Sequence, residues 1–326
     1  LWLGADLMSA LQQMFLGTAP AAGGWALWSW GQNALGSLGL GNLTNYSSPK
    51  QVGALTTWST VAGGNLSSFA VKTDGTLWSW GNNGNGNLGL GNTTNYSSPV
   101  QIGALTTWSK IASGITSAGA LAIKTDGTLW SWGGNASGQL GLGNTTSYSS
   151  PKQVGALTTW SEVAGTNTFS LAIKTDGTLW SWGYNTQGAL GLGNTTNYSS
   201  PKQVGALTTW SKVSGVSSSV VAIKTDGTLW SWGRNNYGQL GLGNITDYSS
   251  PKQVGALITW SKISAGDSFS LAIKTGGTLW SWGFNNRGQL GLGDITNRSS
   301  PVQVGALTTW FEVAGVSNGA ALALKT

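Results

Sequence analysis

The chain has 326 residues, of which 51 are Gly and 20 are Trp, while 8% are charged and none is Cys or His. The lack of Cys excludes disulfides and thiolate metal sites, and the lack of His removes the commonest general base and metal ligand, so we expect no enzyme, cofactor or metal. The formal net charge is +6, but the lysines next to one turn of each repeat predict a dispersed ring and not the basic patch of a nucleic-acid-binding protein: Lys72, Lys124, Lys174, Lys224, Lys274 and Lys325.

Two sequence markers recur along the chain with a period of about 50 residues. The pentapeptide LWSWG occurs six times, and the second Trp of successive copies is spaced by 50, 52, 50, 50 and 50 residues. The tripeptides TTW and ITW keep the same period. A fixed period of this length predicts one supersecondary unit copied in series, in a closed ring or a solenoid.

Residues 59–108 illustrate what each copy is expected to form. Asp74-Gly75 predicts a type I′ hairpin turn between the second and third strands. In the third strand the alternation places Trp78 and Trp80 on one face, where we expect them to pack between neighbouring copies. Four short antiparallel strands per copy are typical of a propeller blade, which makes the fold class all-β. The four expected strands are residues 59–63, 69–73, 76–81 and 99–105.

The two ends of the repeat region predict how the fold closes. The sequence LALKT (322–326) stands where another TLWSWG strand would be expected next, and the first repeat begins with that strand after Gly24. We therefore expect the N- and C-terminal strands to share one blade, which leaves no open edge. Residues 24–326 then form a β-propeller of six four-stranded blades, with seven as the less favoured count.

The repeat resembles that of the regulator of chromosome condensation family. The pattern GxNxxGQLGLG, followed by PxxV and AIKTDGTLWSWG, is well kept in residues 233–257 and 283–307, and the resemblance covers about residues 24–326. It implies a propeller fold and leaves the function open, since family members include an exchange factor for a small GTPase, an ultraviolet-B photoreceptor and an inhibitor of β-lactamases. The nearly identical copies are closest in character to bacterial or phage-encoded members.

Two loops differ between the copies while the rest barely changes. One follows LWSWG, and the other precedes the AIKT strand, as in residues 63–68, 165–170 and 266–270. In an up-and-down blade both loops lie at the same edge, and a constant scaffold with variable loops is how binding surfaces are built. Drift in exposed loops is the alternative interpretation. The candidate binding residues, all of types enriched at interfaces, are Tyr184, Arg234, Tyr237, Phe284 and Arg287.

Acidic residues outside the repeated turns show no recognisable catalytic pairing. They are Asp247, Asp267, Asp294, Glu162 and Glu312.

Residues 1–23 lie outside the repeat and are interpreted as a leader. Leu7, Leu11, Met14 and Phe15 fall at helical spacing, which predicts a short amphipathic helix. The segment fits neither a signal peptide nor a membrane span. Two interpretations stay open: the leader plugs one face of the propeller, or it docks the propeller to a larger assembly.

The leading functional hypothesis is a non-enzymatic binding or structural module. We place it on a phage particle or bacterial surface, where the variable loops contact a protein or glycan receptor. One alternative is a purely structural virion component anchored through the leader. Another is a cytoplasmic regulator resembling a GTPase exchange factor. No nucleic-acid partner and no membrane span are expected.

Overall fold

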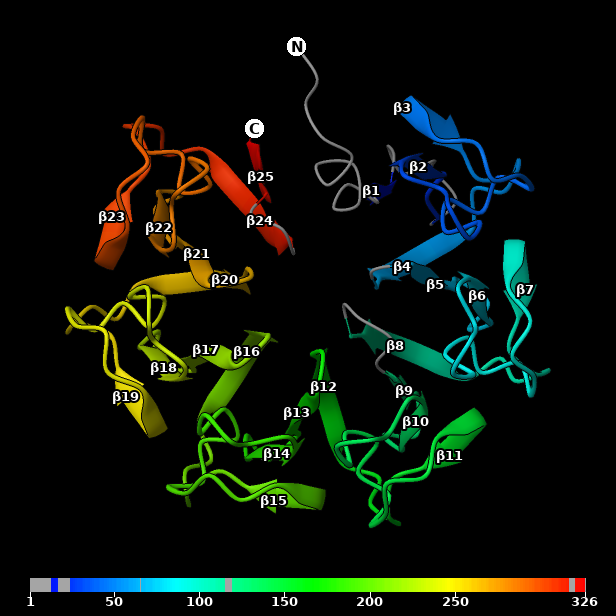
Figure 1. The fold of residues 1–326 in the computed structure, drawn as a ribbon, viewed down its shortest axis with the longest axis horizontal. Coiled ribbons are helices and arrows are strands. Elements are labelled where there is room, and N and C mark those ends of the chain that lie inside the picture. Colours follow the sequence, from blue (N-terminus) through cyan, green and yellow to red (C-terminus); the bar gives the residue numbers. More distant parts are fainter. Residues whose placement is uncertain (1–12, 17–23, 65, 115–118, 317–319, 326) are drawn as a thin grey trace. The chain divides into compact units, whose positions relative to one another are not determined.

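The computed structural model describes residues 13–16, 24–64, 66–114, 119–316 and 320–325. The chain divides into two compact units, Leu1–Thr168 and Phe169–Thr326, hereafter unit 1 and unit 2. Every regular element in the described residues is a β-strand, and Figure 1 shows the same succession of strands in copy after copy. Among these residues no helix has the length and apolar character needed to cross a membrane.

Unit 1 contains one three-stranded and two four-stranded antiparallel sheets, whose strands pair in chain order. The first is β1 (Gln13–Leu16), β2 (Leu27–Gly31) and β3 (Tyr46–Gln51). The second is β4 (Trp58–Gly63), β5 (Ser67–Lys72), β6 (Leu77–Gly81) and β7 (Tyr96–Gln101). The third is β8 (Trp108–Ser113), β9 (Ala120–Lys124), β10 (Leu129–Gly133) and β11 (Tyr148–Gln153), after which unit 1 ends with β12 (Trp160–Gly165).

Unit 2 repeats this arrangement. It begins with the paired strands β13 (Phe169–Lys174), β14 (Leu179–Gly183) and β15 (Tyr198–Gln203). A four-stranded sheet follows with β16 (Trp210–Val216), β17 (Ser219–Lys224), β18 (Leu229–Gly233) and β19 (Tyr248–Gln253). The next has β20 (Trp260–Ala265), β21 (Phe269–Lys274), β22 (Leu279–Gly283) and β23 (Arg298–Gln303), and β24 (Trp310–Val316) pairs with β25 (Ala320–Lys325). The expected four-stranded unit is thus confirmed.

The two faces of an LWSWG strand belong to two different hydrophobic clusters. In β6, Trp80 packs with Leu27 and Trp58 on the side of the preceding sheet, whereas Leu77 packs with Trp108 and Trp132 on the side of the following sheet. Trp80 is fully buried, and its Nε1–H donates a 2.9 Å hydrogen bond to the Ser37 carbonyl of the preceding copy. The prediction that the tandem Trp residues pack between copies is confirmed, because period-two alternation fixes which face each side chain takes.

The Asp-Gly turn differs from the expected type I′ hairpin. Gly75 has φ +77°, but Asp74 is not among the positive-φ residues, and type I′ requires positive φ at both central positions. The Gly75 N–H donates to the Lys72 carbonyl, which is the bond of a type I turn followed by a left-handed Gly. The Asp74 carboxylate explains the preference, since it accepts from the Thr76 N–H at 2.9 Å and Thr76 Oγ1 at 2.7 Å.

The fourth strand begins earlier than expected. β7 covers Tyr96–Gln101 and not residues 99–105, so Pro99 lies within the strand. The strand pairs only with β6, and an outer edge tolerates a proline that donates no hydrogen bond.

The predicted helix of the leader is wrong where the structure describes it. Met14 and Phe15 lie in strand β1, while Leu7 and Leu11 lie outside the described residues. β1 pairs with β2 in the register Gln13↔Trp30 to Leu16↔Leu27. A strand forms here because the edge of β2 opposite β3 would otherwise expose unpaired N–H and C=O groups.

The expected closure also differs. The neighbours of β2 are β1 and β3, so the position foreseen for the C-terminal strand is filled by β1. β24 and β25 form a two-stranded sheet within the described residues. The described residues therefore do not contain the expected pairing of the C-terminal strand with β2.

Candidate functional site

The five candidate binding residues all belong to unit 2 and follow LWSWG strands. Copies are numbered by these strands, so β14, β18 and β22 open copies four, five and six. Tyr184, Arg234 and Phe284 come directly after the three strands, and Tyr237 and Arg287 follow three residues later in copies five and six. Arg287 is exposed, and the other four side chains are half-buried.

Polar residues, of which Asn235 is the same in all six copies, hold the loop that carries Arg234. The buried Asn235 donates from Nδ2 to the carbonyls of Asn244 and Thr246, both at 3.0 Å, and its Oδ1 accepts from the Leu240 N–H at 2.9 Å. Its own N–H donates to Asp247 Oδ1 at 2.6 Å. Because these hydrogen bonds hold Asn235, different residues can occupy the neighbouring position of Arg234 while the loop keeps its conformation.

Gln239 fastens the same loop to the next copy. Its carbonyl accepts 2.9 Å hydrogen bonds from Ser270 Oγ and Trp282 Nε1, and its side chain accepts from the Tyr237 N–H at 2.9 Å. Gln239 is 2% exposed, so water does not compete for these bonds. Tyr237 is thereby brought against Phe284, with ring centroids 4.5 Å apart and planes tilted by 49°.

The second variable loop lies directly beside the first. The Ser218 carbonyl accepts from the Arg234 N–H, and the Ser268 carbonyl accepts from the Phe284 N–H, both at 2.9 Å. These bonds place the two loops at one edge of each sheet, as the sequence predicts for an up-and-down blade.

The second loop also contains strained backbone. Ser217 (φ 53°) and Ser268 (φ 79°) are the non-glycine residues with positive φ in the described chain. Ser217 Oγ donates to Asp267 Oδ1 at 2.5 Å, which joins the loops of copies five and six. Strained positions of this kind cluster at binding sites, where the surrounding structure holds them in place.

The loops of this region carry charges of both signs, with Arg234 and Arg287 on one side and Asp247 and Asp267 on the other. The Asn236 amide, with its oxygen turned to the guanidinium, accepts from Arg234 Nη2 at 3.1 Å and Nε at 3.3 Å. Asp267 accepts from Ser217 Oγ and Asp247 accepts from the Asn235 N–H, so two acids stand in these loops with the two arginines. Arginines and aromatic residues are enriched at protein interfaces.

Of the five predicted residues, the structure brings Tyr237 and Phe284 into direct contact. Tyr237 contacts Phe284, and both Arg234 and Phe284 contact the second loop through their backbone. Arg287 stands three residues after Phe284, and its N–H donates to Gln289 Oε1. Tyr184 is placed by the repeat, because it occupies in copy four the position that Arg234 has in copy five. Gln187 has the position of Tyr237 and should therefore face Arg234.

Comparison with known proteins identifies the family. The family description "RCC1-like domain" matches residues 28–324. The chain belongs to the RCC1-like domain family. The repeated four-stranded sheets of this RCC1-like chain are therefore those of an RCC1-like β-propeller, and the expected resemblance is confirmed.

Solved structures share the RCC1-like fold at low sequence identity. Human WBSCR16 matches with a TM-score of 0.81 and 23% identity over 96% of this chain and 87% of that chain. Yeast RCC1 (Prp20), solved with Kap60, matches with a TM-score of 0.77 and 19% identity over 97% and 78%. Prp20p from Saccharomyces cerevisiae, described with its binding to Gsp1p and histones, matches with a TM-score of 0.66 and 17% identity over 98% and 94%. No curated protein matches the sequence.

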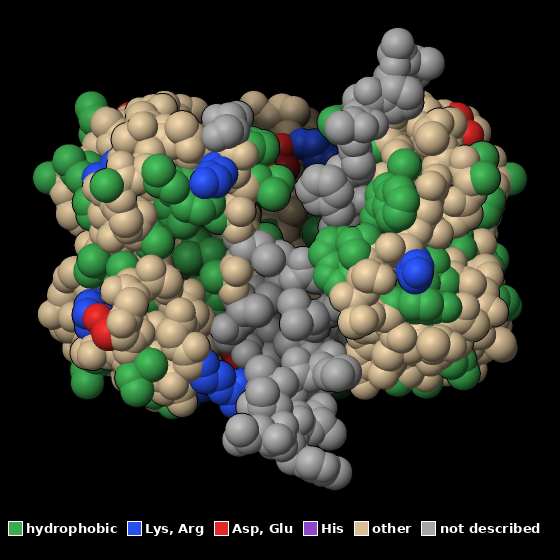
Figure 2. Space-filling model, turned by 90° about the horizontal axis from the view of Figure 1, so that it is seen from above, with side chains coloured by type: hydrophobic (Ala, Val, Ile, Leu, Met, Phe, Trp, Pro, Cys, Tyr) green, Lys and Arg blue, Asp and Glu red, His purple; other side chains and the backbone are tan. Residues whose placement is uncertain are grey.

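Repeated lysines of the RCC1-like chain, among them Lys72 and Lys224, are stacked on tryptophan rings, and their dispersed ring stays a prediction. Lys72 is 9% exposed, and its Nζ lies 3.8 Å from the Trp78 ring centroid and 5.1 Å from that of Trp58. Lys224 repeats this on Trp230 at 3.5 Å. Burial lowers the pKa of Lys72 below its ordinary value, while the Asp74 carboxylate acts in the opposite direction. A cation stacked on two aromatic faces is partly desolvated. On the face drawn in Figure 2, Lys and Arg side chains lie scattered among uncharged ones.

Sequence reasoning missed the ion pairs of the acidic residues. Glu162 pairs with Lys110, and Glu312 pairs with Lys262 at 2.8 Å. Each pair joins equivalent positions of neighbouring copies, and a column-by-column comparison of the copies would have found it. In the described residues, no three His, Cys, Asp or Glu side chains gather as a metal site would require.

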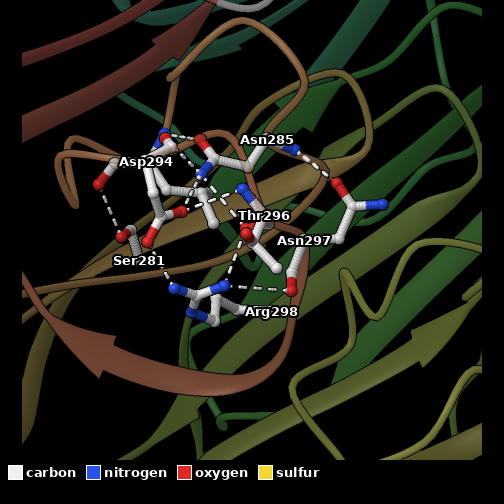
Figure 3. A network of polar contacts seen from close by, with 7 residues as sticks. Ser281, Asn285, Asp294, Thr296, Asn297 and Arg298 are labelled. Atoms are coloured by element: carbon white, nitrogen blue, oxygen red, sulfur yellow. Dashed lines mark hydrogen bonds and ion pairs between the residues drawn. The ribbon is translucent and has the colours of Figure 1, made fainter.

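Copy six contains a coupled replacement that also went unnoticed. In copies one to five an Asn amide donates to a Tyr hydroxyl four residues on, as Asn244 does to Tyr248 at 3.3 Å. Copy six has Asp294 and Arg298 instead, with Nη2 and Oδ2 2.5 Å apart, and Asp294 still accepts from the Thr296 N–H at 2.8 Å (Figure 3). Hydrogen bonding by that N–H, together with the Arg298 charge, lowers the pKa of Asp294. An ion pair between Asp294 and Arg298 thus replaces the Asn–Tyr hydrogen bond, and the loop is preserved because both residues changed together.

Proposed function

We propose that this RCC1-like chain is a non-catalytic regulatory module that binds a protein partner through one edge of unit 2. The contact region, here the variable-loop surface, comprises Tyr184, Arg234, Tyr237, Phe284, Arg287 and the loops 216–218 and 266–268. The observation that carries the proposal is the Tyr237–Phe284 ring contact, which joins two copies through the residues that vary most. The family supports it, since propellers of this kind present loops from a constant scaffold.

The proposed partner surface offers apolar groups to the aromatic rings and acceptor groups to the two arginines. Two arginines and three aromatic rings are the residue types that dominate binding energy in protein interfaces. The loops that carry them are held by buried hydrogen bonds, so little ordering entropy is lost on binding. A glycan receptor, also predicted from the sequence, would use the same aromatic rings but has no support from the relatives.

A regulator resembling a GTPase exchange factor is the second candidate. Yeast Prp20p shares the fold and is described with binding to Gsp1p, which favours this candidate over a virion component. A cytoplasmic location accompanies it. The virion or bacterial-surface location and the anchoring role of the leader stay predictions, and the comparisons lend them no support.

The test is affinity capture from the native lysate with matched variants. The triple variant Arg234→Ala, Tyr237→Ala, Phe284→Ala should reduce recovery of the specific partner at least about tenfold, since loss of hot-spot residues costs about 2 kcal/mol or more. The control carries Gln32→Ala and Asn82→Ala, the positions of Arg234 in copies one and two, and should retain the partner. Both proteins must melt cooperatively, so that a folding defect is distinguished from lost binding.

Recovery that is equal for the two proteins would contradict the variable-loop surface. If the captured partner is a GTPase, release of its labelled nucleotide decides the second candidate. Faster release with the parent chain and not with the triple variant supports an exchange factor. Binding without acceleration leaves a binding module.

A further inference from the structure

Two matching cavities lie between neighbouring sheets of unit 1. The first, of about 370 Å³, is between the sheets β1–β3 and β4–β7, and the second, of about 360 Å³, is between β4–β7 and β8–β11. Equivalent residues line both. In the first cavity these include Trp58, Trp78, Val52, Leu55 and Pro99; in the second they include Trp108, Trp130, Ile102, Leu105 and Pro151.

The walls of each cavity are aromatic and aliphatic, and the mouth is open to solvent. Trp58 and Trp78 meet edge to face, with centroids 6.2 Å apart and planes at 83°, and Trp108 and Trp130 repeat this at 6.1 Å and 79°. Leu55 and Leu105 at the mouths are each 48% exposed. Large aliphatic side chains this exposed at a repeated position mark a surface able to bury apolar groups of a ligand.

A largely buried lysine is stacked on a lining indole of each cavity. Lys72 lines the first cavity, and its Nζ lies over the Trp78 ring; Lys124 lies over Trp130 of the second cavity at 3.8 Å. Both lysines are 9% exposed. Within the described residues neither lysine has a carboxylate at ion-pair distance, although the Asp74 charge still acts on Lys72. The ring faces compensate part of the lost hydration, but they satisfy none of the three N–H donors.

We propose that each of these cavities binds a carboxylate carried on a short apolar stem. The carboxylate accepts hydrogen bonds from the lysine ammonium, and the stem packs on the leucine, the proline and the indole edges. A charge-assisted bond in a partly desolvated site is stronger than one at the surface. Nothing in this site depends on the variable-loop surface, which lies in unit 2.

Two sources could supply this chemistry: a free short-chain carboxylic acid, or the C-terminus of a peptide that ends in an apolar residue. Hexanoate and N-acetyl-Gly-Leu represent them. Hexanamide and N-acetyl-Gly-Leu-amide are the neutral controls, equal in shape and apolar area.

The experiment follows the lysine Hε and Cε signals of the full chain by NMR during titration with each probe. Protons stacked on an indole are displaced by the ring current, and the Lys72→Arg and Lys124→Arg variants assign the two signals. At least one acid should shift both signals saturably, while the amides leave them in place. A response to hexanoate alone indicates a free acid as the natural ligand, and a response to the peptide alone indicates a C-terminus.

Two variants serve as each other's control. Leu55→Asp places a fixed carboxylate at the first mouth and should abolish the Lys72 shift while Lys124 still responds; Leu105→Asp should do the reverse. Leu43→Asp, at a residue 62% exposed and outside the cavity lining, should change neither. Equal shifts with acid and amide, no shift with either acid, or loss of both signals' response in all three variants would overturn the proposal.

Discussion

Single glycines between the copies decide how closely a loop can approach the neighbouring indole. Gly89 (φ +73°) lies so near Trp132 that an added Cβ would stand 2.7 Å from Nε1 and 2.9 Å from Cδ1. That nitrogen donates to the Asn87 carbonyl at 2.9 Å, so the indole has no freedom to retreat without losing its hydrogen bond. Gly103 (φ +62°) has equally left-handed backbone, but nothing lies within 4 Å of its Cβ position.

We predict that Gly89→Ala destabilises the chain much more than Gly103→Ala. Both substitutions carry the strain of a left-handed alanine, about 1–2 kcal/mol. Only Gly89→Ala also forces Trp132 to move, which adds about 2–4 kcal/mol for overpacking and a lost hydrogen bond. Denaturant unfolding followed by Trp fluorescence measures the difference. Equal losses for the two variants would show that Trp132 has room to shift.

At the scale of elements, the strands that alternate strictly were predictable, and those that depend on a partner were not. The LWSWG strands keep a period of two, so Leu77 and Trp80 were assigned correctly to opposite faces. The leader carries a helical spacing, but β1 forms because an open edge of β2 is available. The sequence of the leader gives no sign of a strand edge that forms elsewhere in the fold. Pairing with that edge outweighed the helical spacing of the leader.

The β1–β2 pairing gives a prediction for the leader. Deleting residues 1–16 should raise amide hydrogen exchange in β2, because removing β1 exposes the edge that it covers. The equivalent strand β6, paired on both sides by β5 and β7, is the internal control and should stay protected. Hydrogen-exchange mass spectrometry of the peptides from both strands makes the comparison. Unchanged protection of β2 would mean that another strand covers it in solution.

The site was predictable in its position and not in its contacts. Comparison of the copies pointed to the loops after LWSWG, and the bonds from Arg234 and Phe284 to the second loop confirm that the two loops share an edge. The Tyr237–Phe284 contact was missed because it joins non-equivalent positions of neighbouring copies. It depends on how closely the hydrogen bonds of Gln239 hold its loop against the next copy. The spacing of residues in the sequence does not specify this distance.

For the whole molecule, repetition multiplies small electrostatic effects. Side-chain and backbone hydrogen bonds from Thr76 lower the pKa of Asp74, and corresponding bonds do so for Asp126, Asp176 and Asp226. Burial lowers the pKa of the stacked lysines Lys72, Lys174, Lys224 and Lys274. The carboxylates stabilise the fold when ionised, whereas the lysines cost stability when protonated.

We therefore predict that stability rises with pH in two separate ranges. The aspartate contribution is complete above the ordinary value of 3.8 and is lost as the pH falls through the lowered pKa values. The lysine penalty is relieved as the pH rises from the lowered values to the ordinary 10.5, because the unfolded chain then holds more protons. Urea midpoints from about pH 2 to about pH 11 test both ranges.

Asp74→Gly is the matched control for the acid range, since copy six has Gly276 at this position. It should reduce the loss at low pH and enlarge the alkaline rise somewhat, because the Asp74 charge raises the pKa of Lys72 and its removal lowers that pKa further. A stability that falls as the pH rises toward 10.5 would contradict the role given to the lysines.

In copies two, three, five and six the second indole of LWSWG donates a hydrogen bond to the preceding copy, and this has an evolutionary consequence. Trp80 donates to Ser37, Trp132 to Asn87, and Trp232 to Ala189, so each copy carries a donor for one neighbour and an acceptor for the other. An in-frame duplication or deletion of one copy therefore recreates a complete junction without any further mutation. Unequal recombination between the nearly identical gene segments can change the copy number of this family member in one step, while the loops diversify independently.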